Sequence, residues 1–169
     1  IVVAEAEFAG FGASGRNGGW CSALLPMGFE AMAHEHGRDA ATRMQREMND
    51  TVDEVGRVVA AEGIDCHWAK GGTFRAARNP AHIPRMLEEM AESRAFGFGA
   101  DDLRWLEADE SAEVIATTHQ LGGLYSPHCA AIHPTRLVRG LARVVEARGV
   151  RIHEGTRVLD LQPGRLVTD

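Results

Sequence analysis

Glycines and polar side chains are concentrated between residues 7 and 20, in the stretch EFAGFGASGRNGGW. Five of its residues are glycine. Glycine permits a positive φ angle, and it lets a ligand approach bare backbone. Ser14, Arg16 and Asn17 add a hydroxyl, a guanidinium and an amide, which suit phosphates and sugar hydroxyls. The stretch therefore predicts either a tight connection or a loop that holds a ligand with phosphate and sugar groups.

An acidic residue closes the apolar run that precedes this loop. The run is IVVAE, residues 1–5, and its β-branched residues favour a buried strand. The carboxylate of Glu5 can accept two hydrogen bonds from a ribose diol, as the acid of the dinucleotide-binding signature does. The other half of that signature, G-x-G-x-x-G between a strand and a helix, is absent ahead of Glu5. We therefore expect it upstream of Ile1, and we expect this chain to be an internal fragment of a longer one.

The composition is that of a globular protein with no affinity for nucleic acid. Hydrophobic residues make up 44% and charged residues 25% of the 169 residues, and the formal net charge is −6. Acids and bases are interleaved, with no basic stripe. No apolar run is long enough to span a bilayer, and no signal peptide is recognisable. Three widely spaced cysteines (Cys21, Cys66 and Cys129) argue against a disulfide framework and a zinc site, so we expect a cytoplasmic setting.

Hydrophobic periodicity predicts a mixture of helices and strands. Apolar residues three and four positions apart indicate helices, and β-branched runs bounded by glycine or proline indicate strands. The predicted helices cover 38–62, 81–96 and 134–148, with a shorter one within 103–115, and the predicted strands lie within 1–5, 67–78, 121–133 and 150–169. This pattern is typical of an α/β or α+β protein.

Each long predicted helix has one face that we expect to be buried. We expect Gly63 and Gly149 to end helices, Pro134 to begin one, and Asp109 or Ser111 to cap the short helix. The period of the first helix is formed by Ala41, Met44, Met48, Val52, Val55 and Val59, one face of the second carries Ile83, Leu87, Met90 and Arg94, and the inward residues of the third are Leu137, Leu141, Val144 and Val145. We expect the four methionines at helical spacing, Met44, Met48, Met86 and Met90, in the core.

Three stretches together carry a family resemblance. They are VVAEAEFAGFGASGRNGGWCSALLP, GIDCHWAKGGTFRAAR and GGLYSPHCAAIHPTRLVRGLARVVEARGVRIHEGTRVLDL, which cover most of the chain. The first resembles the second-strand region of FAD-dependent oxidoreductases of the D-amino-acid oxidase superfamily, most closely the gamma-glutamylputrescine oxidoreductase branch. The resemblance implies a partial FAD-binding Rossmann-like domain with part of an α+β substrate domain inserted.

The resemblance also implies roles for individual residues. Glu5 would bind the hydroxyls of the adenosine ribose, and Val158 would pair through its backbone with the adenine edge. The loop residues would follow the cofactor from the pyrophosphate to the flavin: Ser14, Gly15 and Arg16 along the pyrophosphate and ribityl chain, then Asn17, Gly18 and Gly19 near the flavin ring. Residues 1–62 and 128–169 would belong to the FAD-binding domain and residues 63–127 to the substrate domain.

The activity implied by the resemblance is FAD-dependent oxidation of an amine or amino acid. A hydride would pass from the carbon next to nitrogen to flavin N5, and the resulting imine would hydrolyse, with oxygen or another electron acceptor reoxidising the flavin. We expect the fragment alone to be inactive. A truncated, non-catalytic domain of this fold and another FAD-linked reductase stay open as alternatives.

Histidine and cysteine groups elsewhere invite a metal or nucleophile interpretation. His34 and His36 alternate in sequence and point to different sides of a helix. His128, Cys129 and His133 are denser but lack an acidic third ligand at fixed spacing, and a nucleophilic Cys129 with a histidine base is the other reading. We expect no metal and assign no catalytic residue; we expect structural roles for this group, with His133 near a helix start.

Overall fold

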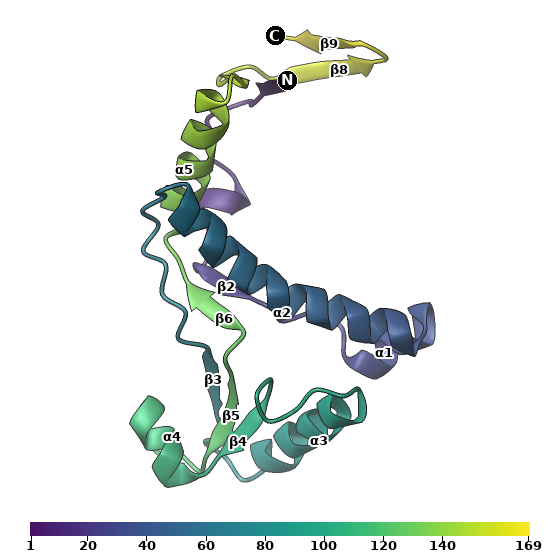
Figure 1. The fold of residues 1–169 in the computed structure, drawn as a ribbon, viewed down its shortest axis with the longest axis vertical. Coiled ribbons are helices and arrows are strands. Elements are labelled where there is room, and N and C mark those ends of the chain that lie inside the picture. Colours follow the sequence, from purple (N-terminus) through teal and green to yellow (C-terminus); the bar gives the residue numbers. More distant parts are fainter. The chain divides into compact units, whose positions relative to one another are not determined.

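The computed structural model describes all residues, 1–169 (Figure 1). These residues group into two compact units. The first unit comprises Ile1–Trp20, Gly56–Ala69 and Ala131–Asp169, and the second comprises Cys21–Val55 and Lys70–Ala130. Residues 21–55 therefore group with the second unit. The fold is the mixed α/β arrangement expected from the sequence.

The first unit contains a parallel strand pair, one complete helix, a hairpin and the end, from Gly56, of the long helix α2 (Arg38–Ala61). Strand β1 (Val2–Ala4) runs parallel to β7 (Arg151–His153), with Val2 opposite Arg151. A single 3-10 turn, η1 (Ala13–Gly15), follows β1, and α5 (Pro134–Ala147) precedes β7. The hairpin of β8 (Val158–Gln162) and β9 (Arg165–Thr168) turns at Pro163–Gly164, where Gly164 has a φ of +75°.

Helix α5 has the start and the stop that its sequence predicts. His133 is its N-cap, and the ring Nδ1 accepts a hydrogen bond from the Arg136 N–H at 3.4 Å. Pro134 occupies the first turn, where no N–H is needed. Gly149, with a φ of +86°, follows the helix in the left-handed region that a side chain disfavours.

The second unit is built on a three-stranded antiparallel sheet in the order β3-β5-β4. A separate two-stranded sheet joins β2 and β6. Their bounds are β2 (Trp20–Ser22), β3 (Thr73–Ala76), β4 (Arg104–Leu106), β5 (Gly123–Ser126) and β6 (Cys129–Ala131), and the helices are α1 (Phe29–His36), α2 (Arg38–Ala61), α3 (His82–Ala95) and α4 (Ala108–Val114). No helix of the structure is both long and apolar enough to cross a membrane.

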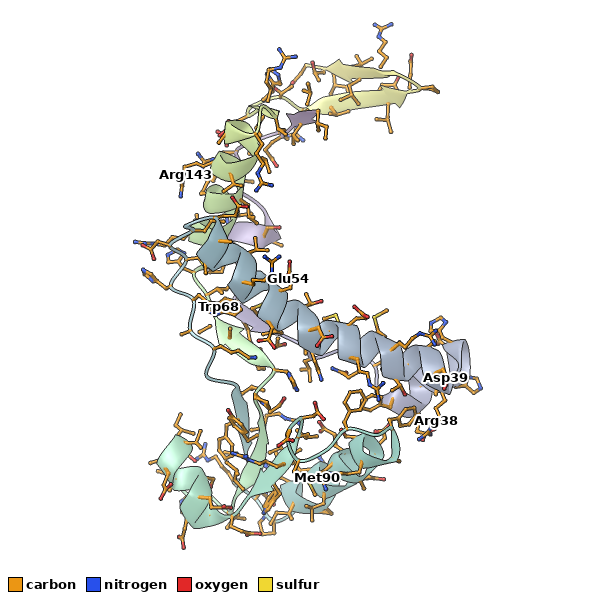
Figure 2. The ribbon with its side chains drawn as sticks, in the orientation of Figure 1. Arg38, Asp39, Glu54, Trp68, Met90 and Arg143 are labelled. Atoms are coloured by element: carbon orange, nitrogen blue, oxygen red, sulfur yellow. The ribbon has the colours of Figure 1, made fainter.

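Aromatic side chains form the core of the second unit. Phe29 stacks on Phe96 with ring centroids 4.8 Å apart and lies 5.1 Å from the ring of Phe98. Met32 and Ala41 complete the buried cluster. Arg38, labelled in Figure 2 at the start of α2, covers the Phe96 ring with its guanidinium carbon 4.1 Å from the ring centroid.

The predicted apolar stripe of α2 is buried at Ala41, Val52 and Val59, and a polar network lies beside it at Asn49. On α2, Met44 is 51% exposed, whereas Asn49 is only 8% exposed. The Asn49 amide oxygen accepts a hydrogen bond from the Gln45 side chain at 2.9 Å, so this buried polar atom has a partner. Asp102 accepts the N–H of Gly99 at 2.9 Å and lies 3.0 Å from Nε2 of His128. The expectation that Met44 faces inward was therefore wrong.

Two other helix faces and one cap also differ from expectation. Leu87 of α3 is 40% exposed, and Leu141 of α5 is 39% exposed, whereas the smaller Ala142 beside Leu141 is 9% exposed. The cap of α4 is Glu107, which exchanges hydrogen bonds with Glu110 in a capping box, so neither Asp109 nor Ser111 caps that helix. Ser111 is instead fully buried. On α5, Gly140 and Ala142 are buried, and the predicted inward residues Leu137, Val144 and Val145 are partly buried.

Strand β1 is not buried in the described chain. Its residues Val2 and Val3 are 49% and 40% exposed. The strand has β7 as its single partner. Its β-branched composition correctly predicted a strand, because those residues suit extended backbone wherever the strand lies.

Candidate functional site

The glycine-rich loop is folded by the side chain of Asn17. The Asn17 amide donates to the carbonyls of Ala13 and Ser14 at 3.0 and 3.3 Å, and its oxygen accepts the N–H of Gly19 at 2.8 Å. Asn17 therefore satisfies backbone groups that a tight loop leaves unpaired. Its amide shapes the loop from within.

Helix α5 and Ile132, which lies between β6 and α5, hold this loop in place. The Thr135 hydroxyl donates to the carbonyl of Gly15 at 2.7 Å. The carbonyl of Gly19 accepts the N–H of Ile132 at 2.8 Å. Both contacts fix backbone atoms of the loop, so the loop is attached at two points near the beginning of α5.

The five glycines of the loop fall into two classes. At Gly10, Gly15 and Gly19, an added Cβ would lie 2.4, 2.0 and 2.2 Å from other atoms of the chain, and Gly10 and Gly19 also have positive φ angles. At Gly12 and Gly18, no atom lies within 4 Å of an added Cβ, and neither φ is positive. Packing inside the chain therefore requires glycine at three positions and leaves it unexplained at Gly12 and Gly18.

Glu5 follows β1 and carries a carboxylate with one open oxygen. Its backbone N–H donates to the carbonyl of His153 at 2.9 Å, which extends the contact between β1 and β7. Its Oε1 accepts the N–H of Glu7 at 3.0 Å. Its Oε2 has no hydrogen-bond partner in the structure, so this oxygen is available to a donor from outside the chain.

The remaining predicted residues lie on exposed parts of the first unit. Ser14 is exposed in η1. The Arg16 guanidinium lies over the ring of Phe11, 4.1 Å from its centroid, and this contact holds a cation at the loop surface. Val158 begins β8, opposite Thr168 of β9, and is 41% exposed.

Sequence reasoning missed a carboxylate that contacts the loop from far along the chain. Glu154 Oε1 accepts the N–H of Ala9 at 2.9 Å, across 145 positions in sequence. The Arg139 guanidinium pairs with the same oxygen. The Ala9 hydrogen bond and then Arg139 hold the pKa of the Glu154 carboxyl below its ordinary value. No spacing could have revealed this contact, because only the tertiary fold brings the residues together.

Gly10, Gly12 and Gly15 have the spacing G-x-G-x-x-G. They follow the acid Glu5, whereas the dinucleotide signature precedes it. The single turn η1 ends at the last of them, Gly15, and its three residues are too few for a helix N-terminus that could bind phosphate. The match in spacing therefore does not make this loop the phosphate-binding turn of the signature.

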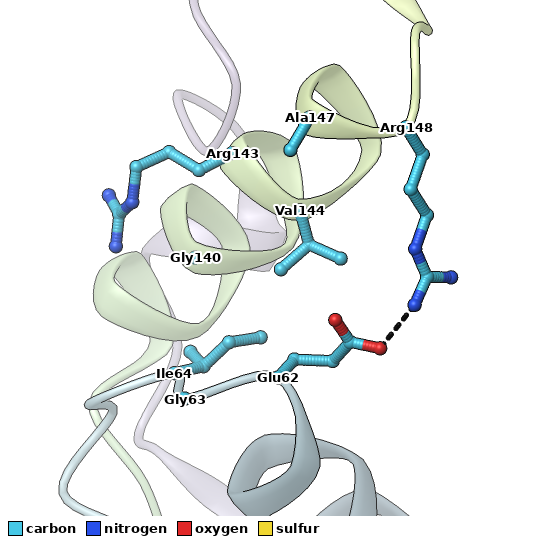
Figure 3. A pocket seen from close by; sticks show the side chains of 8 residues that line it. All are labelled: Glu62, Gly63, Ile64, Gly140, Arg143, Val144, Ala147 and Arg148. Carbon is cyan, nitrogen blue, oxygen red and sulfur yellow. Dashed lines mark hydrogen bonds and ion pairs between the residues drawn. The ribbon is translucent and has the colours of Figure 1, made fainter.

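A pocket of about 300 Å³ lies between the end of α2 and α5 (Figure 3). Glu62 and Arg148 on its lining form an ion pair with each other. The Arg143 guanidinium lies on the opposite side of the view from that pair. Ile64 packs against Gly140, where an added Cβ would lie 2.3 Å from the isoleucine methyl group. The pocket therefore lies beside a packing contact between α5 and Ile64, and none of its lining residues belongs to the predicted site.

The histidine and cysteine group forms structural contacts. His128 pairs with Asp102, as described above, and Cys129 is 1% exposed. His133 caps α5, as expected. Burial raises the pKa of the Cys66 thiol, the other buried cysteine, so that thiol stays protonated at neutral pH.

The whole chain, residues 1–169, matches the DAO family, described as FAD dependent oxidoreductase. This chain belongs to the DAO family. Among curated DAO-related proteins, it is 30% identical to the gamma-glutamylputrescine oxidoreductase of Escherichia coli K12 over 162 residues, 96% of this chain and 37% of that protein. It is 27% identical to the probable oxidoreductase OrdL of Haemophilus influenzae, over 95% of this chain and 37% of that protein.

Solved structures have the same fold as this DAO-family chain. Glycine oxidase from Geobacillus kaustophilus superposes with a TM-score of 0.71 at 20% identity, over 99% of this chain and 44% of that protein. L-proline dehydrogenase from P. horikoshii gives a TM-score of 0.72 at 14% identity, over 98% of this chain and 40% of that one. The chain thus spans about two fifths of the length of the proteins it matches.

Proposed function

We propose that the protein containing these residues is an FAD-dependent oxidoreductase that acts on an amine or amino acid. The observation that carries the proposal is the Glu5 Oε2 atom, which has no hydrogen-bond partner, next to a loop in which no atom lies within 4 Å of an added Cβ at Gly12 or Gly18. A carboxylate with a free oxygen at the end of a parallel strand suits a ribose diol. Membership of the DAO family supports FAD as the ligand.

In this proposal the loop residues hold different parts of the cofactor. Glu5 accepts the hydroxyl protons of the adenosine ribose, and the Arg16 cation and Ser14 hydroxyl bind the pyrophosphate. Gly18 brings bare backbone near the flavin. The carbonyl of Gly15 is engaged by Thr135 and the side chain of Asn17 by the loop itself. Gly15, Asn17 and Gly19 therefore act by keeping the loop in its binding conformation.

Val158 would contact the adenine edge through its backbone. Thr156, two residues before Val158, donates its backbone N–H to the carbonyl of Glu5 at 2.8 Å. The start of β8 and the segment after β1 therefore belong to one surface of the first unit. This supports an adenosine site made by both.

FAD, when bound, supplies the electron acceptor for oxidation of the carbon next to the substrate nitrogen. We assign the residues of the first unit to FAD binding and those of the second unit to the substrate side. The residues described here bind and orient the cofactor. No side chain here carries the role of a catalytic acid or base, and oxygen or another electron acceptor completes turnover.

The test is the visible spectrum of the complete gene product. We expect a flavin spectrum in the purified protein, and anaerobic bleaching of that spectrum by at least one member of a panel containing gamma-glutamylputrescine, glycine and L-proline. Oxygen consumption with the active amine then distinguishes an oxidase from an enzyme that uses another acceptor. A protein that binds no flavin after incubation with FAD contradicts the proposal and favours a non-catalytic domain of this fold.

Replacing Glu5 tests the cofactor site itself. Glu5→Ala should weaken FAD binding about tenfold or more, because charge-assisted hydrogen bonds to the ribose are lost. Glu7→Ala is the matched control, since the Glu7 side chain makes an exposed ion pair with Arg157 and should leave the affinity unchanged. Equal FAD affinity for Glu5→Ala and the unaltered protein would remove Glu5 from the site.

A further inference from the structure

The turn that follows β7 holds the segment that follows β1. Three backbone hydrogen bonds join the two segments, and one side chain adds a fourth contact. The Glu5 N–H donates to His153, the Gly155 N–H to Glu7, and the Thr156 N–H to Glu5, at 2.9, 2.8 and 2.8 Å, while the Ala9 N–H donates to the Glu154 carboxylate at 2.9 Å. Residues 5–9 are therefore fixed by residues 153–156 beyond the end of the β1–β7 ladder.

Glu154 provides the only side-chain contact in this set, and it binds the far end of the segment. The backbone contacts end at Glu7, so Ala9 depends on the carboxylate. Arg139 of α5 pairs with the same oxygen and orients it. The lowered pKa of Glu154 keeps the group ionised at neutral pH, where a carboxylate accepts both hydrogen bonds.

The position of Ala9 bears on the orientation of the Glu5 carboxylate. Glu5 Oε1 accepts the N–H of Glu7, which lies midway between Glu5 and Ala9. Releasing Ala9 would free the backbone on the far side of Glu7 and loosen this hydrogen bond. The open oxygen of Glu5 would then no longer point in one direction.

We propose that Glu154, oriented by Arg139, is a positioning residue that sets the Glu5 carboxylate for the ribose diol of FAD. This inference rests on the proposed function. Glu154 touches no ligand in this scheme. It acts through Ala9 and the Glu5–Glu7 turn, and Arg139 couples the turn to α5, which also holds Gly15 through Thr135.

The test compares FAD with its 2′-deoxyadenosine analogue. Titration of the complete apoprotein, followed by flavin fluorescence, gives both dissociation constants for the unaltered protein, Glu154→Ala and Arg139→Met. The unaltered protein should prefer FAD, and Glu154→Ala should lose most of that preference while weakening FAD binding about fivefold or more. Arg139→Met should give a smaller loss, because the Ala9 hydrogen bond remains.

Glu7→Gln is the matched control for charge in the same segment, because its side chain makes an exposed ion pair with Arg157. It should keep the preference of the unaltered protein. A merely structural role of Glu154 would weaken both cofactors equally, so an unchanged ratio of the two dissociation constants would overturn the inference.

Hydrogen exchange of the apoprotein measures the anchoring separately from cofactor binding. Glu154→Ala should speed amide exchange within residues 6–12, and Glu7→Gln should not. Unchanged exchange in Glu154→Ala would show that the carboxylate does not hold the segment and would refute the inference. Failure of the unaltered protein to bind FAD would instead refute the proposed function.

Discussion

Alanine at Gly15 and at Gly18 should separate the folding of the glycine-rich loop from its binding role. At Gly15, an added Cβ would lie 2.0 Å from the carbonyl oxygen of Gly10 and 2.8 Å from its carbonyl carbon. Real Cβ atoms essentially never lie within 3.0 Å of another heavy atom in this way. Both atoms belong to the backbone, so the loop has to shift. Overpacking of this kind costs about 1–3 kcal/mol, and we expect Gly15→Ala to destabilise the protein by about 2 kcal/mol.

Gly18 should tolerate the same change without loss of stability. No atom lies within 4 Å of the added Cβ, and the φ of Gly18 is not in the left-handed region. Replacing glycine at an unstrained position reduces the entropy of the unfolded chain, so Gly18→Ala should leave stability unchanged or raise it by about 0.4–1 kcal/mol. If FAD approaches the backbone there, the methyl group should weaken FAD binding about tenfold.

Urea unfolding of the complete apoprotein, followed by circular dichroism, measures the first effect, and flavin fluorescence titration measures the second. Destabilisation of the two variants to the same extent would refute the loop packing described above. An unchanged FAD affinity in Gly18→Ala would show that the cofactor does not use the space at that position.

Three further predictions concern stability. Gly140→Ala should destabilise the first unit by about 1–3 kcal/mol, because the added Cβ would overlap the Ile64 side chain. In an Ile64→Ala background this loss should be smaller, which a double-mutant cycle of unfolding free energies measures. Asp102→Ala removes a carboxylate that contacts Asn49, Gly99 and His128 through three hydrogen bonds, and it should cost about 1–3 kcal/mol in urea unfolding. Asp101→Ala, at an exposed neighbour, should cost under about 0.5 kcal/mol. The pKa of the Glu154 carboxyl is lower in the folded than in the unfolded chain. The stability that this carboxylate adds is therefore complete above the ordinary carboxyl pKa of about 4.3 and is lost as the pH falls through the folded pKa. Unfolding midpoints measured on acidification should fall less steeply for Glu154→Gln than for the unaltered protein, and parallel profiles would contradict this.

Local features of the sequence were sufficient for the position of the main elements. Pro134, Gly149 and Gly164 act through their own backbone angles, so the start of α5, its end and the β8–β9 turn were predictable without knowledge of their neighbours. Strand β1 and the long helix α2 likewise follow from residue type and period. The buried face of α2 was predicted at Ala41, Val52 and Val59 but not at Asn49, because a polar side chain is buried only where the fold supplies hydrogen-bond partners.

The sequence by itself determined the family, the mixed α/β class and the stretch of chain that forms the candidate site, because an acid after a strand and a glycine-rich loop are adjacent along the chain. Only the tertiary structure decided which glycines are needed for packing and which leave open space, because contacts at Gly10, Gly15 and Gly19 come from a carbonyl or side chain that the fold brings near. The contacts of Thr135, Arg139 and Glu154 that hold the loop could not be predicted from the sequence either. Their hydrogen bonds cross up to 145 positions, and such contacts exist only after the chain has folded.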